Sequence, residues 1–337
     1  MVNQIDFVPI LLILLISLFT RKEAGRPDNC FSFGNCQMIK GLMSVFVVLC
    51  HLSLIYSGGV ILPVFEYLGD IAVGIFFFLS GYGLMKQYLA KEDYHILFLQ
   101  KRFSKVFIPY LIINALYWFY YLAIGEPYGM SDFINTIKTG DLLVSYSWYV
   151  VEILILYLFF YLFMLIDRKR KQYMIILNII LYLALIIVFR SIHYAPHWYV
   201  STYMYIFGLL YVVFERQFSD LLDKYKFLLL CLTIAFIVAL LFRKKAFYYF
   251  DTFLLLLIIL FLRDVTVKNL LLTFLGKISL EIYLLHGLVI KFFRRFISSE
   301  ETFIALIILI ILIIISSYGF NFIYSTLFRR KRKVLHC

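Results

Sequence analysis

Long apolar runs, separated by short polar segments, dominate the pattern of this chain. Most are about 17–25 residues long, the length that an α-helix needs to cross a lipid bilayer. The runs do not alternate apolar and polar residues with period two, so they predict helices and not the strands of a membrane barrel. The pattern predicts eleven membrane-spanning helices, near residues 4–20, 38–57, 66–86, 104–124, 146–166, 173–190, 197–214, 226–242, 246–262, 276–293 and 302–325.

The basic residues follow these runs with a bias. Clusters of Lys and Arg fall in alternate loops and in the tail at 329–333, and only the loops at 243–245 and 291–295 break the alternation. Cytoplasmic loops of membrane proteins carry the excess of Lys and Arg. The pattern therefore predicts a multi-pass protein of the cell membrane with its N-terminus outside and its C-terminal tail in the cytoplasm.

The composition supports a membrane protein over a soluble one. The chain has 337 residues, of which 64% are hydrophobic and 15% charged, whereas soluble domains are about 45–50% apolar and 25% charged. The formal net charge of +12 lies between apolar runs, so we interpret it as a topology signal, with membrane lipid and not nucleic acid as the partner.

An ionisable pair stands out in the run at 38–57. Lys40 and His51 are eleven positions apart, about 16 Å and three turns along a helix, so both side chains project from one face. A histidine this deep in an apolar run is expensive in lipid and is by default a functional candidate. One cation near the membrane edge and one imidazole well inside predict the wall of a polar cavity.

A second histidine, His286, lies in the segment GKISLEIYLLHG, where Ser279, Tyr283 and His286 share one helix face. On the predicted topology it reaches about the same depth as His51. A lone buried histidine is more often structural, but two at one depth favour a shared polar site if their helices adjoin.

Small residues crowd the segment GDIAVGIFFFLSGYGL. They permit either close helix packing or an accessible backbone beside a substrate channel, and we assign Ser80 to such a channel. Asp70 begins this run near the predicted depth of His51. Its carboxylate either orients the imidazole, as carboxylates do for catalytic bases, or caps the helix in water.

Three more charged residues are candidates. Arg102 and Lys105 share a helix face near the cytoplasmic surface, where they are either topology determinants or a clamp for the phosphates of an anionic cofactor. Glu152, four positions after Trp148, should face the bundle interior, because a carboxylate facing lipid is costly. The sequence contains no HExxH, CxxC or phosphate-binding Gly-rich loop, and we expect no metal.

In their order, these segments resemble the acyltransferase 3 family of membrane proteins. The resemblance rests on Lys40, ten intervening positions and His51, on FFFLSGYGL, on the basic run at 102–109, on Trp148-Tyr149 and on GKISLEIYLLH. It covers roughly residues 30–325. The family usually has arginine where this chain has Lys40, and this chain adds an N-terminal helix.

The resemblance implies an all-α polytopic transmembrane helical bundle, with a ten-helix core plus the extra N-terminal helix. We divide the chain into an N-terminal hydrophobic helix and cytoplasmic linker, residues 1–29, and a membrane acyltransferase domain with a basic cytoplasmic tail, residues 30–337.

The resemblance also implies an O-acyltransferase. Members of the family move an acyl group, commonly acetyl, from cytoplasmic acyl-CoA to a hydroxyl, often that of an extracytoplasmic or lipid-linked glycan. We expect His51 to act as general base, and Tyr283, Ser279 or His286 to donate to the oxyanion. The catalytic candidates are His51, Asp70, Glu152, Tyr283 and His286, and the candidates for binding acyl-CoA (acetyl-CoA) are Lys40, Ser80, Arg102 and Lys105.

A membrane transporter or exporter of a glycan or small solute is the alternative. Intramembrane ionisable residues and helices rich in small residues are common there as well. The inverted repeats of many transporters are not visible in this sequence, which favours the enzyme. The acceptor, the acyl group and the oligomeric state stay open.

Overall fold

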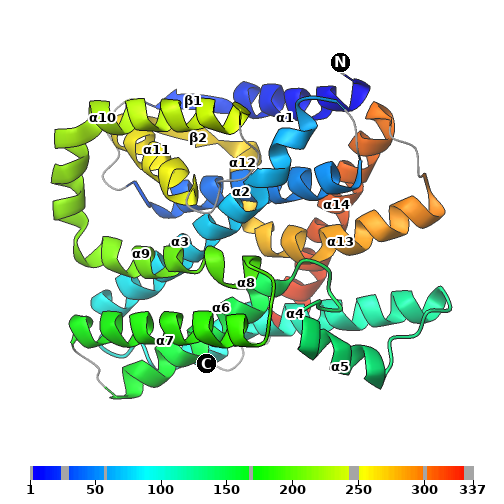
Figure 1. Cartoon of the computed structure of the whole chain (residues 1–337), viewed down its shortest axis with the longest axis horizontal. Helices are drawn as coiled ribbons and strands as arrows, with labels where there is room; N and C mark the ends of the chain where they lie inside the picture. Colours follow the sequence, from blue (N-terminus) through cyan, green and yellow to red (C-terminus); the bar gives the residue numbers. More distant parts are fainter. Residues whose placement is uncertain are drawn as a thin grey trace.

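The computed structural model describes residues 3–23, 30–56, 59–166, 170–242, 250–298 and 302–329, and most of them are helical (Figure 1). The predicted linker at 24–29, the basic loop at 243–245 and the tail from residue 330 lie outside the described residues. Among the described residues, six helices are long and apolar enough to cross a membrane. These are α2 (Phe33–Ile55), α3 (Leu68–Ala90), α4 (Phe98–Ala123), α6 (Trp148–Ile166), α7 (Lys171–Ser191) and α14 (Phe303–Tyr324). The prediction of a multi-pass helical membrane protein is therefore confirmed.

Several other predicted spans are not single long helices. The segment at 276–293 lies mostly in an 18-residue helix, Ser279–Phe296, which meets the preceding helix, Leu270–Lys277, at 75°. The segment at 197–214 breaks into a helix of 4 residues and one of 11. An 11-residue helix is about 16 Å long, which is too short for a hydrocarbon layer of about 30 Å. The remaining helices are α1 (Phe7–Leu18), α5 (Met130–Thr139), α8 (His197–Val200), α9 (Tyr203–Val213), α10 (Glu215–Phe242), α11 (Phe250–Asp264), α12 (Leu270–Lys277) and α13 (Ser279–Phe296), with short η1 (Gln4–Asp6), η2 (Leu62–Tyr67) and η3 (Ser325–Arg329).

The expected number of spans is therefore not confirmed. The described residues give six spans, or seven if the α12–α13 pair crosses as one. At about 1.5 Å per residue, α1 with its 12 residues and α11 with its 15 are each shorter than a bilayer. A span requires an apolar run, but breaks and bends within such a run can leave helices that are too short to cross the bilayer.

A small two-stranded sheet accompanies the predicted all-α helical bundle. Strand β1 (Thr20–Glu23) pairs antiparallel with β2 (Thr266–Asn269), and Thr20 lies opposite Asn269. The Asn269 amide also donates to the Thr20 hydroxyl and to the carbonyl of Ile16, both at 2.8 Å. Four-residue strands carry too short a pattern to be predicted. The sheet fastens the end of α1 to the start of α12.

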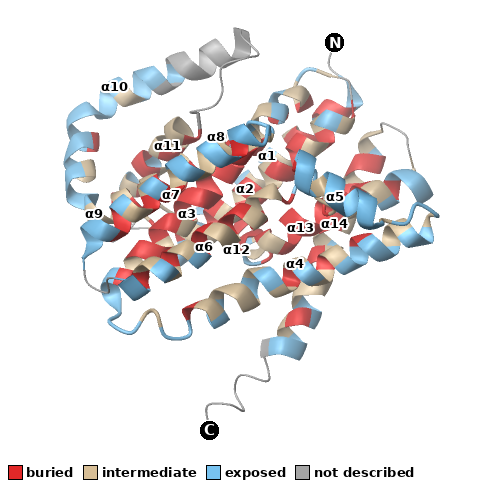
Figure 2. Cartoon of the chain, turned by 60° about the horizontal axis from the view of Figure 1, so that its bottom comes forward, coloured by how far each residue is buried: buried red, intermediate tan, exposed pale blue. Residues whose placement is uncertain are grey.

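Helices α2 and α3 form the centre of the molecule, where buried residues concentrate (Figure 2). Two glycine contacts hold neighbours against them. A Cβ at Gly41 of α2 would lie 2.0 Å from the carbonyl oxygen of Leu272 on α12, and one at Gly81 of α3 would lie 2.1 Å from that of Tyr205 on α9. On the partner helices, Gly276 and Gly208 meet α2 and α3 just as closely. The helices therefore pack backbone against backbone.

The bundle has two chemically different ends. Lys40 lies in the first half of α2, and its charge is near enough to that of Arg102 on α4 for the two to repel. His51 lies near the opposite end of α2, and Asp70 lies at the start of the antiparallel α3. We call these the cationic end and the histidine end. The last turn of α14 reaches the cationic end, where the Tyr324 hydroxyl donates to the carbonyl of Ser104.

The N-terminal segment is fastened to the histidine end by one carboxylate. Asp6 is fully buried and accepts hydrogen bonds from the backbone N–H groups of Asn3 and of residues 60–62, at 2.8–3.0 Å. Gly59 passes the carboxylate with a φ of +77°, and a Cβ there would lie 2.3 Å from it. Asp6 therefore fixes the loop between α2 and α3, a role that the sequence analysis did not assign.

Replacing Gly81 with Ala should destabilise the protein, while the same change at Gly83 should not. A Cβ added at Gly81 would overlap the backbone of α9, whereas nothing lies within 4 Å of a Cβ at Gly83. Overpacking typically costs about 1–3 kcal/mol, and Ala favours a helix over Gly by about 1 kcal/mol. Thermal unfolding of both variants in detergent measures the difference. Equal unfolding temperatures would contradict the backbone contact between α3 and α9.

Asp6→Ala should lower stability by about 2–5 kcal/mol, because it leaves several buried N–H groups without an acceptor. Burial by itself raises the pKa of Asp6, but the backbone hydrogen bonds outweigh it and hold the pKa below its ordinary value. The contribution is therefore complete above the unfolded-state pKa, about 3.9, and is lost as pH falls through the lower folded-state pKa.

Unfolding of the parent and of Asp6→Ala across this acidic range tests the clamp, and their stabilities should converge as pH falls. The control is Glu23→Ala, which removes an exposed ion pair with Lys268 and should cost less than about 1 kcal/mol. A pH-independent difference between the parent and Asp6→Ala would show that the carboxylate charge is not involved.

Candidate active site

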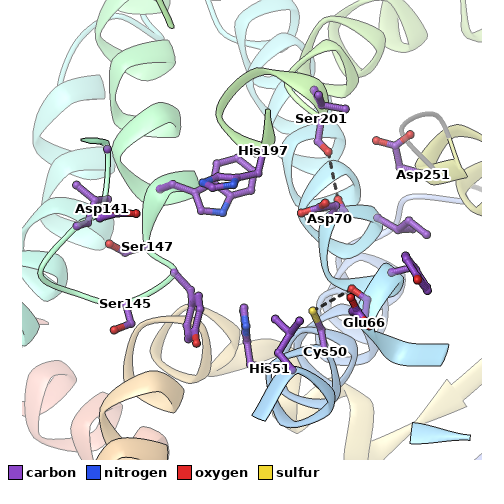
Figure 3. Close-up of a pocket in the computed structure, with 18 of the residues that line it drawn as sticks. Cys50, His51, Glu66, Asp70, Asp141, Ser145, Ser147, His197, Ser201 and Asp251 are labelled. Atoms are coloured by element: carbon purple, nitrogen blue, oxygen red, sulfur yellow. Dashed lines mark hydrogen bonds between the residues drawn. The ribbon is translucent and has the colours of Figure 1, made fainter. Parts of the chain in front are cut away.

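A cavity of about 900 Å³ lies at the histidine end of the bundle (Figure 3). Its walls come from the last turns of α2, the first turn of α3, the loop before α6, and α8. Segments far apart in the sequence thus meet around one space. Its lining includes both charged and aromatic side chains, so it can hold a polar ligand.

His51 is one of the two predicted catalytic residues that line this cavity, with Asp70. Its ring lines the cavity and stacks on the ring of Tyr146, with centroids 3.7 Å apart. The His286 ring stacks at 4.8 Å from that of His51, so α2 and α13 bring the two histidines together as the sequence suggested. The Nδ1 of His51 is buried and has no hydrogen-bond partner among the described residues.

His286 is fully buried and is not among the residues that line the cavity. Its Nδ1 lies 3.1 Å from the carbonyl oxygen of Ile282. A carbonyl only accepts, so Nδ1 donates this hydrogen bond, and in a neutral imidazole Nε2 then has the lone pair. That Nε2 has no partner within the described part of the chain. His286 therefore contacts His51 only through the stacked rings, and of these two histidines His51 is the one that lines the cavity.

Tyr283 holds the loop that covers His51. Its hydroxyl donates to the backbone carbonyl of Tyr146 at 2.5 Å, and Tyr146 has a φ of +66°, uncommon for a bulky side chain. Ser279 likewise donates to the carbonyl of Gly276. Both hydroxyl hydrogens that the sequence offered to an oxyanion therefore have backbone partners.

Asp70 lines the cavity from α3, across from His51 (Figure 3). Its carboxylate lies in the first turn of α3, where a negative charge is favourable. It makes no hydrogen bond to the Nδ1 of His51, which has no partner among the described residues. Its backbone carbonyl accepts a hydrogen bond from the Ser201 hydroxyl at 3.3 Å, which connects α3 to α8.

Glu152 faces the bundle interior, as the cost of a carboxylate in lipid predicted. It is fully buried, and its Oε1 accepts a hydrogen bond from Thr202 at 2.5 Å. Its Oε2 has no partner among the described residues. Glu152 is not among the residues that line the cavity, so the structure does not bring it to His51.

The four predicted donor-binding residues do not line this cavity either. Arg102 donates to the Tyr94 hydroxyl at 2.9 Å, and its guanidinium lies over the rings of Phe98 and Tyr157. Lys40 is half-buried beside it, and Lys105 is exposed. The Ser80 hydroxyl lies 3.4 Å from that of Tyr149, in the middle of α3. Lys40 and Arg102 thus lie close enough together for their charges to interact, whereas Ser80 lies farther along α3 beside Tyr149.

A family model described as an acyltransferase domain matches residues 36–323, most of the chain. The chain belongs to the acyltransferase 3 family. The family resemblance seen in the sequence is thereby confirmed. No curated protein and no solved structure matches the chain. The match begins within α2 and ends within α14, so the cavity and both stacked histidines lie inside the acyltransferase domain.

The acyltransferase cavity also contains residues that the sequence analysis missed. Asp251 of α11 is buried at its edge, beside Gly74 of α3, and accepts a hydrogen bond from the Tyr203 hydroxyl. Asp251 could have been predicted from the sequence, because it is an ionisable residue within the apolar run at 246–262, just as His51 is within the run at 38–57. Tyr146 and His197 carry no such signal, because their places in the wall depend on how the loops fold.

Proposed function

We propose that this acyltransferase moves an acetyl or similar acyl group from acyl-CoA on one side of the membrane to a glycan hydroxyl on the other. The observation that carries the proposal is that His51 lines a cavity of about 900 Å³ at the end of α2 remote from the cluster of Lys40 and Arg102. A cationic site at one end and a base at the other suit a donor and an acceptor that occur on opposite sides.

The cationic end is proposed to hold the donor. Arg102 and Lys40 offer two neighbouring cations for the phosphates of CoA, and Lys105 lies one helical turn after Arg102. An arginine keeps its charge when half-buried, and its planar guanidinium can bind a phosphate through two N–H groups. The pantetheine arm would then follow α2 for the roughly 16 Å to His51.

At the histidine end, His51 is proposed to act as general base. The acceptor hydroxyl oxygen attacks the thioester carbonyl carbon while its proton moves to His51. The C–S bond then breaks, and the CoA thiolate takes up the proton from His51. Direct transfer and an acyl-enzyme intermediate both use this base.

The membrane orientation follows the same assignment. The cationic end would face the cytoplasm, where acyl-CoA is made, and the histidine end would face outward. Asp6 fastens the N-terminal segment at the histidine end, while the end of α14 packs beside Ser104 at the cationic end. This arrangement agrees with an N-terminus outside and a C-terminus in the cytoplasm. The acyltransferase family match favours this function over the transporter that the sequence alone left open.

His51→Ala should abolish acyl transfer without loss of folded protein. Removal of a general base typically lowers kcat by about 100- to 10,000-fold. The measurement is the transfer of radiolabelled acetyl from acetyl-CoA to glycans, with the purified protein in vesicles. A matched control is His95→Ala, because His95 lies between α3 and α4 at the cationic end. Near-normal transfer by the His51 variant would remove His51 from the mechanism.

Arg102→Ala should raise KM for acyl-CoA more than it lowers kcat, because phosphates bind equally in ground and transition states. A charge-assisted contact contributes roughly 1.5–3 kcal/mol, so KM should rise by about 10- to 150-fold. Added salt should weaken donor binding in the parent more than in the variant.

Two further variants separate charge from packing at this position. Tyr94→Phe removes the hydrogen-bond partner of Arg102 but keeps its cation, and Lys101→Ala removes an exposed neighbouring cation. Both should keep KM within about threefold of the parent. If Arg102→Ala leaves KM unchanged in folded protein, the donor phosphates bind elsewhere.

A further inference from the structure

A short amphipathic helix, α5, lies beside the His51 cavity and has no part in the mechanism above. Its apolar side chains recur with helical spacing and are exposed: Met130 by 73%, Phe133 by 51%, Ile134 by 46% and Ile137 by 56%. The helix buries none of its own residues. A helix surrounded by water does not normally carry such a stripe, so an apolar medium or partner covers it.

The other face of α5 is polar and lines a second cavity of about 460 Å³. Asp132, Asn135 and Thr136 contribute to that lining. Asp141 and Lys291 line both this cavity and the His51 cavity, so the two spaces adjoin. We call the second space the α5 cavity. One face of α5 is therefore an exposed apolar stripe, and the opposite face lines a polar cavity that adjoins the His51 cavity.

The membrane itself accounts for the apolar stripe. Helix α4 is a candidate span, and its last turns expose Trp118 by 40%, Phe119 by 58% and Leu122 by 48%. Helix α5 begins seven residues after α4 ends, so its stripe continues the lipid-facing surface where the span reaches the bilayer edge. Tryptophan near the end of a span is typical of the membrane interface, and an amphipathic helix there lies in the interface plane.

One of the two groups of cations that break the charge alternation, at 291–295, lies at the same place. Lys291 lines both cavities, and Arg295 pairs with Glu126, just before α5, at 3.7 Å with both side chains about half exposed. Arg294 is exposed, and Lys138 lies in the last turn of α5. The lining of the α5 cavity combines Lys291 with the carboxylates of Glu126, Asp132 and Asp141, and these groups can hydrogen-bond the hydroxyls of a polar head group. The exposed Lys138 and Arg294 can attract the phosphates of membrane lipids.

We infer that α5 lies in the membrane surface at the histidine end and that the α5 cavity admits a lipid-anchored acceptor to His51. The apolar stripe sits among acyl chains, while the hydroxyl-bearing head group passes between α5 and the loop before α6. The inference rests on the proposed function and narrows its acceptor to a lipid-linked glycan of the adjacent leaflet.

Spin labels on neighbouring positions of α5 test the membrane contact without any acyl transfer. The label is attached at Ile134→Cys or at Asn135→Cys. Both native side chains are exposed: Ile134 lies on the apolar stripe and Asn135 on the face that lines the α5 cavity. In vesicles of phosphatidylcholine and phosphatidylglycerol, the label at 134 should collide with oxygen, which concentrates in lipid. The label at 135 should collide with a water-soluble nickel chelate. Labelling of the native cysteines is measured in the parent and subtracted.

The result that overturns the membrane contact is equal relaxation of both labels by the nickel chelate. The stripe would then face water or a soluble partner. Lys138→Ala is added to each labelled variant. If the relaxation of both labels by oxygen and by the nickel chelate stays the same, Lys138 does not hold α5 at the membrane surface.

Acyl transfer tests the acceptor separately. The probes are lipid-linked glycans extracted from host membranes and the same glycans released from their lipid by mild acid, each with radiolabelled acetyl-CoA. The lipid-linked fraction should be acylated at least tenfold faster, because anchoring concentrates it at the membrane. Equal rates would overturn the lipid-anchored acceptor. Acylation of neither fraction would contradict the proposed function itself, while the spin labels would still decide the placement of α5.

A double variant connects the two measurements. Phe133→Ser with Ile137→Ser removes apolar surface from the stripe and should lower kcat/KM for the lipid-linked fraction by about tenfold, with little effect on KM for acetyl-CoA. The control is Ile176→Ser with Ile180→Ser on α7, also four positions apart and similarly exposed. An equal loss in both double variants would show a general effect of polar residues on the lipid-facing surface.

Discussion

The cost of an unpaired polar group in lipid governs the arrangement of this acyltransferase. Glu152 is enclosed and accepts the Thr202 hydroxyl, and His286 is enclosed and donates to the Ile282 carbonyl. His51 and Asp70 differ, because both line the cavity, which gives them a polar space. The cost of burying a polar group thus distinguishes Glu152 and His286, which are enclosed in the bundle, from His51 and Asp70, which meet the cavity.

The close contacts at Gly41 and Gly81 make that separation possible. They let α12 and α9 approach the central helices α2 and α3 backbone to backbone. Because α13 follows α12 directly, after a bend of 75°, the contact at Gly41 also helps to place His286 beside His51. A site built from several helices and the loop before α6 therefore depends on contacts made some distance from it. The same two helices, α2 and α3, thus fix the distance between the polar side chains of the histidine end and the cations of the opposite end.

The sequence predicted best whatever depends on position along one helix. Lys40 and His51 lie in the same α2, and Trp148 begins α6, as the runs indicated. The sequence predicted helix lengths poorly where the chain changes direction within an apolar run. The breaks at residues 201–202 and at residue 278 lie within apolar runs, and neither contains a proline. After these breaks, α9 and α12 pack against glycines of the neighbouring helices α3 and α2, contacts that no local pattern records.

The sequence by itself determined that the chain is a multi-pass helical membrane protein of the acyltransferase 3 family, with a histidine inside an apolar run. Hydrophobic periodicity and spacing are local properties, so they can be read along the chain. Only the tertiary structure decided that Tyr146 stacks on His51, that Tyr283 holds Tyr146 in place, and that Asp70 stands across the cavity without bonding to His51. These relations join residues from different helices and loops, and packing between those elements sets their geometry.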